Sequence, residues 1–138
     1  MTKVFVDTGI FVSVLNEEPK YEKAATFLEN VMQNKFDAFI SVITISEILS
    51  VYHKISEKEA IRAKAYIETI FGKDMIVPVI KEIAEIAGKI KATHKMSLGD
   101  AVIVASSIMM GCNYLVSLDP EIRKSGIITV KEPKEIIF

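Results

Sequence analysis

Four acidic residues stand where an α/β protein usually builds its ligand site. Asp7 and Asp119 each follow a short apolar run, and Glu47 and Asp100 lie near the starts of helical patterns. In open α/β sheets, ligands bind at the carboxyl ends of the strands, so these four side chains can converge at one edge of a sheet. Such a group of carboxylates is suited to holding a divalent cation.

The residue types indicate which cation. Two carboxylates in close contact repel each other by roughly 4 kcal/mol at an effective dielectric of about 20, and a divalent metal relieves that cost. Because no Cys or His accompanies the acids, the all-oxygen set favours Mg²⁺ or Mn²⁺ over structural zinc. Hard cations held by carboxylates activate water and neutralise charge on a phosphodiester, as in nucleases and phosphatases.

Each acid also has a purely structural explanation. Asp7 can be the N-cap of the following helix, and Asp100 falls in a first helical turn, where the helix dipole favours an acid. Asp119 precedes a proline and can simply begin a turn. Glu47 can lie at the edge of an apolar stripe and extend to water. If it is buried, it needs hydrogen-bond donors or a cation.

The apolar patterns predict an α/β fold with a central parallel sheet of about five strands flanked by helices. Apolar, β-branched and aromatic runs predict short strands at 4–6, 37–41, 75–79, 114–117 and 127–130. Helical spacing predicts helices around 10–15, 20–34, 42–55, 57–72, 83–90 and 101–110. Because Pro78 cannot donate to a ladder, we expect the third strand at or near a sheet edge.

Capping residues mark several helix ends. Ser56 and Glu59 form a predicted capping box, and Gly72 is expected to close the helix that follows them. Ser97 is the expected N-cap of the most apolar helix, which we expect to end at Gly111.

Length and charge limit the classes of function. A chain of 138 residues, half of them hydrophobic, predicts a single domain over residues 1–138. With 17 basic and 18 acidic side chains, it has no global basic field, so nucleic-acid binding must be local. The most basic run is either a solvated face or a phosphate contact: Lys89, Lys91, His94 and Lys95.

The compartment follows from what the chain lacks. Its one cysteine, Cys112, has no partner for an internal disulfide, which favours a reducing interior. We expect no signal peptide, because the sequence opens with a predicted strand rather than with a basic segment and a long apolar run. The uncharged stretch 101–118 is interrupted by polar residues and predicts a helix, a turn and a strand. We therefore expect a cytoplasmic protein without a membrane span.

Four short motifs resemble, in order, the acidic motifs of PIN domains. They are Val6-Asp7-Thr8, Thr44-x-x-Glu47, Ser97-Leu98-x-Asp100-Ala101 and Leu115-Val116-Ser117-x-Asp119. In particular, the chain resembles the small VapC-type toxins of toxin–antitoxin pairs over essentially its whole length. Any one motif is unspecific, but four in this order are specific.

The resemblance implies a PIN-like three-layer domain with Mg²⁺- or Mn²⁺-dependent endoribonuclease activity on RNA. It also implies a homodimer, and a cognate antitoxin with a segment that occupies the acidic groove. The implied catalytic and metal-binding residues are Asp7, Glu47, Asp100 and Asp119. Of these, Asp7 and Asp100 would be direct ligands, and the other two would complete the site directly or through water. Thr8 and Ser117 would orient carboxylates or water.

The chain departs from the family pattern at several positions. Gly9 stands where a small polar residue is common, and Gly99 where another residue, often Pro, precedes the helical acid. Leu118 follows Ser117 where a small polar residue is usual, and we expect this change to alter the groove and its substrate preference. Ile122 replaces a frequent aromatic residue. None of these changes removes a carboxylate.

Two other classes compete with the nuclease. A catalytically weak PIN fold used for nucleic-acid binding or assembly would keep the acids only as caps and turns. Aspartyl phosphotransfer, as in receiver domains, would form an acyl phosphate on Asp7 and usually needs a Lys at another strand end. No Lys occupies the corresponding position after the fourth strand.

Overall fold

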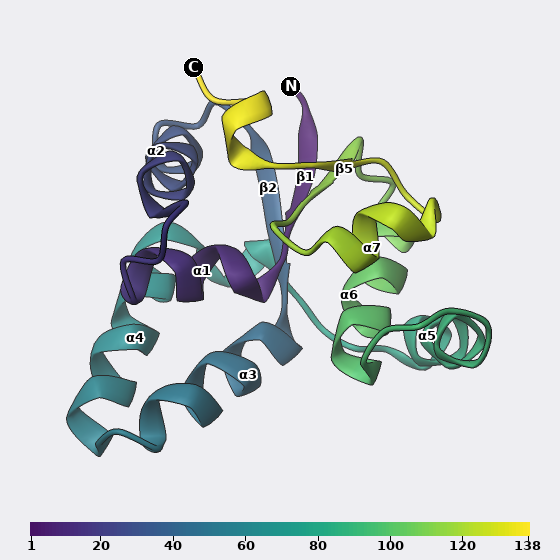
Figure 1. The fold of residues 1–138 in the computed structure, drawn as a ribbon, viewed down its shortest axis with the longest axis horizontal. Coiled ribbons are helices and arrows are strands. Elements are labelled where there is room, and N and C mark those ends of the chain that lie inside the picture. Colours follow the sequence, from purple (N-terminus) through teal and green to yellow (C-terminus); the bar gives the residue numbers. More distant parts are fainter.

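Five parallel strands form one sheet at the centre of the molecule. The computed structural model describes all residues, 1–138, and orders the strands β3-β2-β1-β4-β5 (Figure 1). Their bounds are β1 Lys3–Val6, β2 Asp37–Ser41, β3 Ile76–Val77, β4 Tyr114–Val116 and β5 Val130–Lys131. Every pairing is parallel, as the apolar runs predicted.

Seven helices cover the two faces of this sheet and make the three-layer arrangement expected of the fold (Figure 1). One layer holds α1 Thr8–Leu15, α2 Tyr21–Met32, α3 Val42–His53 and α4 Glu57–Ile70. The other holds α5 Lys81–Thr93, α6 Leu98–Met109 and α7 Pro120–Ser125. Two short 3₁₀ turns, η1 Lys73–Met75 and η2 Pro133–Glu135, complete the chain. None of the helices is both long and apolar enough to span a membrane.

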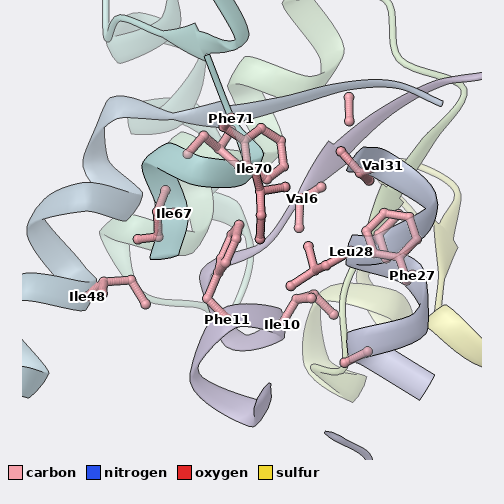
Figure 2. Close-up of a cluster of buried hydrophobic side chains, with 14 of the residues drawn as sticks. Val6, Ile10, Phe11, Phe27, Leu28, Val31, Ile48, Ile67, Ile70 and Phe71 are labelled. Carbon is pink, nitrogen blue, oxygen red and sulfur yellow. The ribbon is translucent and has the colours of Figure 1, made fainter. Parts of the chain in front are cut away.

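The core lies on both sides of the sheet because successive side chains of a strand point to opposite faces. In β1, Val4 and Val6 pack into the cluster beneath α1–α4, whereas Phe5 packs into the cluster beneath α5–α7. Figure 2 shows the first cluster, in which Phe11 of α1 approaches Phe71 after α4. Covering both faces explains why Val4, Phe5 and Val6 of β1 are all apolar.

The pairing register brings the first and fourth strand ends together. Val6 pairs with Val116, and the N–H of Asp7 donates to the carbonyl of Val116 at 3.0 Å. Ser117 follows the last residue of β4, as Asp7 follows the last residue of β1, so Asp7 and Ser117 leave the sheet side by side. The chain proceeds from β1 toward β2 on one side, while β4 and β5 lie on the other. This is a topological switch point, the place where such sheets bind ligands.

Several predicted boundaries differ from the structure. The third strand is limited to Ile76–Val77, because Met75 belongs to a 3₁₀ turn and Pro78 cannot donate; it is an edge strand, as expected. The fifth strand is Val130–Lys131 rather than 127–130. Helix α4 ends at Ile70, and Gly72 has a φ of −71°, so the expected glycine cap is wrong.

The helix caps otherwise follow the prediction in part. The hydroxyl of Ser56 accepts the N–H of Glu59 at 3.1 Å, which is one of the two bonds of a capping box. Ser97 caps α6, and Gly111 follows it with a left-handed φ of 67°. Helix α7 was not predicted. Asp119 is its N-cap, where only a turn was foreseen.

Ion pairs fasten the C-terminal segment to α7 and α2. Arg123 donates to both carboxylate oxygens of Glu135, at 2.7 and 3.0 Å, and Lys20 donates to Glu132 at 2.9 Å. The hydrogen bond from Arg123 is the main reason that the pKa of Glu135 is lowered to about 2. These contacts place residues 132–134 beside the start of α2.

Packing of Phe11 yields a stability prediction. Phe11 is fully buried and meets the Phe71 ring edge-on, with centroids 5.6 Å apart. Phe11→Ala should lower the free energy of unfolding by about 3 to 5 kcal/mol, because it leaves a cavity. Ile61→Ala, at a side chain that is 61% exposed, should change it by less than about 0.5 kcal/mol. Denaturant titration of both variants measures this, and a loss below about 1 kcal/mol for Phe11→Ala would contradict the assigned core.

Candidate functional site

Asp7 is the most buried of the four acids, at 5% exposure. It occupies the N-cap position of α1, but its side chain makes no capping hydrogen bond. Its Oδ2 instead accepts the hydroxyl proton of Ser117, with the two oxygens 2.7 Å apart. Helix capping therefore does not explain this carboxylate, which is tied to the neighbouring strand end.

Ser117 connects two of the acids. It is buried, and besides donating to Asp7 its hydroxyl oxygen accepts the backbone N–H of Asp119 at 3.0 Å. Both roles of this hydroxyl are thus used. The hydroxyl fixes the direction of the Asp7 carboxylate and the position of the chain that carries Asp119.

Glu47 lies on the second turn of α3 and is half-buried. Thr8 donates its hydroxyl proton to Oε1 of Glu47 at 2.6 Å. The Thr8 oxygen also lies 2.9 Å from the hydroxyl of Thr44, which is fully buried. Because Thr8 has one hydroxyl proton and gives it to Glu47, Thr44 must donate to Thr8. Glu47 therefore receives the hydrogen-bond donor that its position required.

Gly99, on the first turn of α6, leaves space for the Glu47 carboxylate. A Cβ at this position would lie 2.5 Å from Oε2 of Glu47, closer than non-bonded atoms approach. The carboxylate therefore rests in the space that a side chain would fill. The sequence shows Thr44 only as part of the Thr44-x-x-Glu47 motif and Gly99 only as a departure from the family pattern. Both residues can be singled out in the sequence, but their relation to Glu47 is visible only in the structure.

Asp100 and Asp119 sit at the starts of two helices and are half-buried. The N–H of Asp100 donates to the Ser97 hydroxyl at 3.1 Å, so Ser97 caps α6 and Asp100 belongs to its first turn. Oδ1 of Asp119 accepts the N–H of Glu121 at 2.8 Å and caps α7. The structural explanation thus applies to one oxygen of Asp119, and the other is not used by this cap.

The acids act on one another electrostatically. Burial raises the pKa of Asp7 to about 7; the Ser117 hydrogen bond opposes this, and the charges of Asp100 and Glu47 add to it. The pKa of Asp100 is also raised, chiefly by burial and then by the charges of Asp119 and Glu47, while Ser97 lowers it. None of the four acids forms an ion pair with Lys or Arg. The charges of Asp100 and Glu47 thus act on Asp7, those of Asp119 and Glu47 act on Asp100, and no ion pair balances them.

The donor chemistry of this site suits a hard divalent cation, because its ligands are carboxylate oxygens and its negative charge is unpaired. No three His, Cys, Asp or Glu side chains are arranged to hold an ion in this conformation. Glu47 is held by Thr8 and by the space at Gly99.

The PIN domain model matches residues 4–127. No curated protein matches the chain by sequence.

Three solved structures illustrate the similarity in fold. The FitAcB structure from Neisseria gonorrhoeae has a TM-score of 0.75 at 17% identity, covering 96% of this chain and 99% of that one. A toxin–antitoxin complex from Klebsiella pneumoniae has a TM-score of 0.72 at 23% identity, with 96% and 99% covered. VapC20 from Mycobacterium tuberculosis, described as a sarcin-ricin loop cleaving toxin, has a TM-score of 0.73 at 18% identity, with 93% and 98% covered.

At these identities the solved structures establish the fold alone. The family follows from the sequence model, which spans most of the chain and all four acids. The resemblance seen in the four acidic motifs is thereby confirmed, and the chain belongs to the PIN-domain family.

Proposed function

We propose that this protein is an Mg²⁺- or Mn²⁺-dependent endoribonuclease that acts as the toxin of a toxin–antitoxin pair. One observation carries the proposal. A buried carboxylate, Asp7, lies at the switch point of the sheet, and the charges of Asp100 and Glu47 act on it without any cation to balance them. Similarity in fold to VapC20, a toxin that cleaves the sarcin-ricin loop, supports RNA as the substrate.

In this proposal the four acids hold the metal, with Asp7 and Asp100 as direct ligands and Glu47 and Asp119 completing the site. When bound, the ion supplies an activated water nucleophile and neutralises charge that develops on the phosphodiester. Ser117 holds the Asp7 carboxylate at 2.7 Å, and Thr8 holds Glu47 at 2.6 Å. These two hydroxyls keep the acids oriented without neutralising them.

The same proposal gives the protein two partners. A cognate antitoxin would cover the acidic site, as suggested by the similarity in fold to a toxin–antitoxin complex from Klebsiella pneumoniae. A second copy of the chain would form a homodimer. The activity belongs in the cytoplasm, where RNA is the available substrate.

A second candidate is a catalytically weak PIN fold that binds nucleic acid or assembles with partners. One observation favours it: Asp119 caps α7 through Oδ1, so at least one of the acids has a structural task. If this second candidate is right, replacing an acid such as Asp7 would leave the rate of RNA cleavage unchanged.

Asp7→Asn separates these candidates. The variant should lose roughly 100-fold or more of its Mg²⁺-dependent RNA cleavage, because carboxylate-held metal contributes several kcal/mol to the transition state. Asp74→Asn, at an exposed acid in η1, is the matched control and should cleave at the wild-type rate. Cleavage is followed on end-labelled RNA across a Mg²⁺ titration. Equal rates for wild type and Asp7→Asn would defeat the catalytic assignment.

Proton binding by Asp7 gives a pH prediction for the metal-free protein. Because burial raises the pKa of Asp7 from 3.8 to about 7, the folded state binds more protons than the unfolded state between these values. In EDTA, the free energy of unfolding should therefore fall as pH rises from about 4 to 7, by up to about 4 kcal/mol from this group. Asp7→Asn should remove that slope and be more stable than wild type at pH 8. Parallel pH dependence in both proteins, measured by denaturant titration, would show that Asp7 does not carry the penalty.

The close approach of Gly99 to Glu47 gives a prediction for metal affinity. Gly99→Ala should displace the Glu47 carboxylate and weaken Mn²⁺ binding by about 10-fold or more, because supporting groups of a metal site have effects of this size. Stability should change by less than about 1 kcal/mol, since the clash involves the end of a flexible side chain. Gly9→Ala, at the same position in α1 with open space around it, is the control. Calorimetric titration that finds equal Mn²⁺ affinity for both variants would refute the role of Gly99.

A further inference from the structure

Two adjoining cavities lie next to the strand end that carries Asp119, yet no acid of the proposed metal site lines them. Their volumes are about 160 and 260 Å³, and they share Pro19, Lys20 and Leu118 as walls. Leu118 stands between Ser117 and Asp119 in the chain. The cavities are therefore neighbours of the acidic site but are formed by other segments, namely the α1–α2 connection and residues 132–134.

The first cavity has an excess of positive charge. Its walls include three lysines, Lys20, Lys23 and Lys134, and one acid, Glu132. Glu132 pairs with Lys20 at 2.9 Å, whereas Lys23 and Lys134 form no ion pair. Two uncompensated cations thus face one cavity in a protein whose net charge is −1. This arrangement attracts an anion.

Two further features favour a ligand with oxygen atoms. Ser13 lines the second cavity, whose charged walls are Lys20 and one acid, Glu18, so the excess of positive charge belongs to the first cavity. Ser13 is 1% exposed, and its hydroxyl has no hydrogen-bond partner. A buried hydroxyl without a partner is costly, so a ligand oxygen there would relieve that cost. The cavities also lie at the N-terminus of α2, whose N-cap Lys20 offers no side-chain cap. Uncapped N–H groups at a helix start favour anions.

The size of the cavities limits the ligand to a small group. Each is smaller than the roughly 300 Å³ that encloses a drug-sized molecule, but each admits a tetrahedral anion. An RNA strand is itself negative and must approach four uncompensated carboxylates. A cationic pocket beside them would hold the strand against that repulsion.

We propose that these two cavities form a backbone subsite, lined by Ser13, Lys23 and Lys134, that binds an RNA phosphodiester flanking the one that is cleaved. The inference rests on the proposed nuclease function for the position of the cleaved bond. Because phosphate contacts carry no base information, the subsite sets the register of the strand and not its sequence preference.

The test measures RNA binding without cleavage. A fluorescent single-stranded RNA is titrated with Asp7→Asn protein in EDTA at several salt concentrations, and affinity is read from anisotropy. Adding Lys23→Ala and Lys134→Ala should weaken binding about 10-fold and lower the salt slope by about 0.7 for each lost contact. The matched control is Lys54→Ala with Lys58→Ala, two exposed and unpaired lysines at the turn between α3 and α4, which changes net charge equally.

Ser13→Ala provides an independent arm. It removes a buried hydroxyl that has no partner, so stability should not fall, while RNA affinity should drop about fivefold through loss of one hydrogen bond. A thermal melt of the same sample separates loss of binding from loss of fold. Unchanged RNA affinity in Ser13→Ala and in the Lys23/Lys134 variant would overturn the subsite.

The remaining outcomes are also decisive. Equal weakening by the two lysine pairs would show a general charge effect and overturn the proposal. The same variants are also titrated with poly-glutamate. If the Lys23/Lys134 variant loses poly-glutamate binding while its RNA binding stays intact, the pocket binds an acidic peptide and the proposal is overturned. If the protein with intact Asp7 fails to cleave RNA while the Lys23/Lys134 effect persists, the subsite stands and the nuclease function fails.

Discussion

A buried carboxylate with no cationic partner is the constraint around which this structure is arranged. Asp7 must leave β1 where Val6 pairs with Val116, and at that point the sheet is covered on both faces by apolar side chains. Water is excluded there, so burial disfavours the ionised form. Burying this carboxylate lowers the free energy of unfolding, and the two flanking hydrophobic cores compensate for that loss. A bound divalent cation would remove the loss by balancing the charge.

The groups that meet the acids are neutral hydroxyls. Ser117 donates a hydrogen bond to Asp7, Thr8 donates one to Glu47, and Thr44 in turn donates one to Thr8. A lysine or arginine in any of these places would orient a carboxylate equally well but would cancel its charge. Hydroxyl support leaves the full negative charge available to a ligand, whereas ion pairs are confined to other surfaces.

The sequence determines some of these features more clearly than others. The apolar runs Val4–Val6 and 38–40 predict their strands well, because a strand that is covered on both faces has no polar residue in its middle. The strands β3 and β5 are only two residues long, so the sequence pattern is too short to predict where they begin and end. Helix α7 begins at Asp119 and Pro120, a pair that equally well begins a turn.

For the site, the four acids could be selected from their places after strands and at helix starts. Their supports could not be paired in advance. Thr8 and Glu47 are 39 residues apart, and the contact of Glu47 with Gly99 depends on how α3 and α6 lie against each other. The walls of the cavities depend on Arg123 and Glu135 binding each other across the C-terminal segment.

The shortness of β3 and β5 has a further consequence, because both lie at the edges of the sheet and Pro78 follows β3 directly. Neither edge offers a continuous row of main-chain donors and acceptors, so another chain cannot extend the sheet by strand addition. The exposed apolar side chains lie away from these edges, with Val51 on α3, Ile61 on α4 and Ile55 in the turn between them.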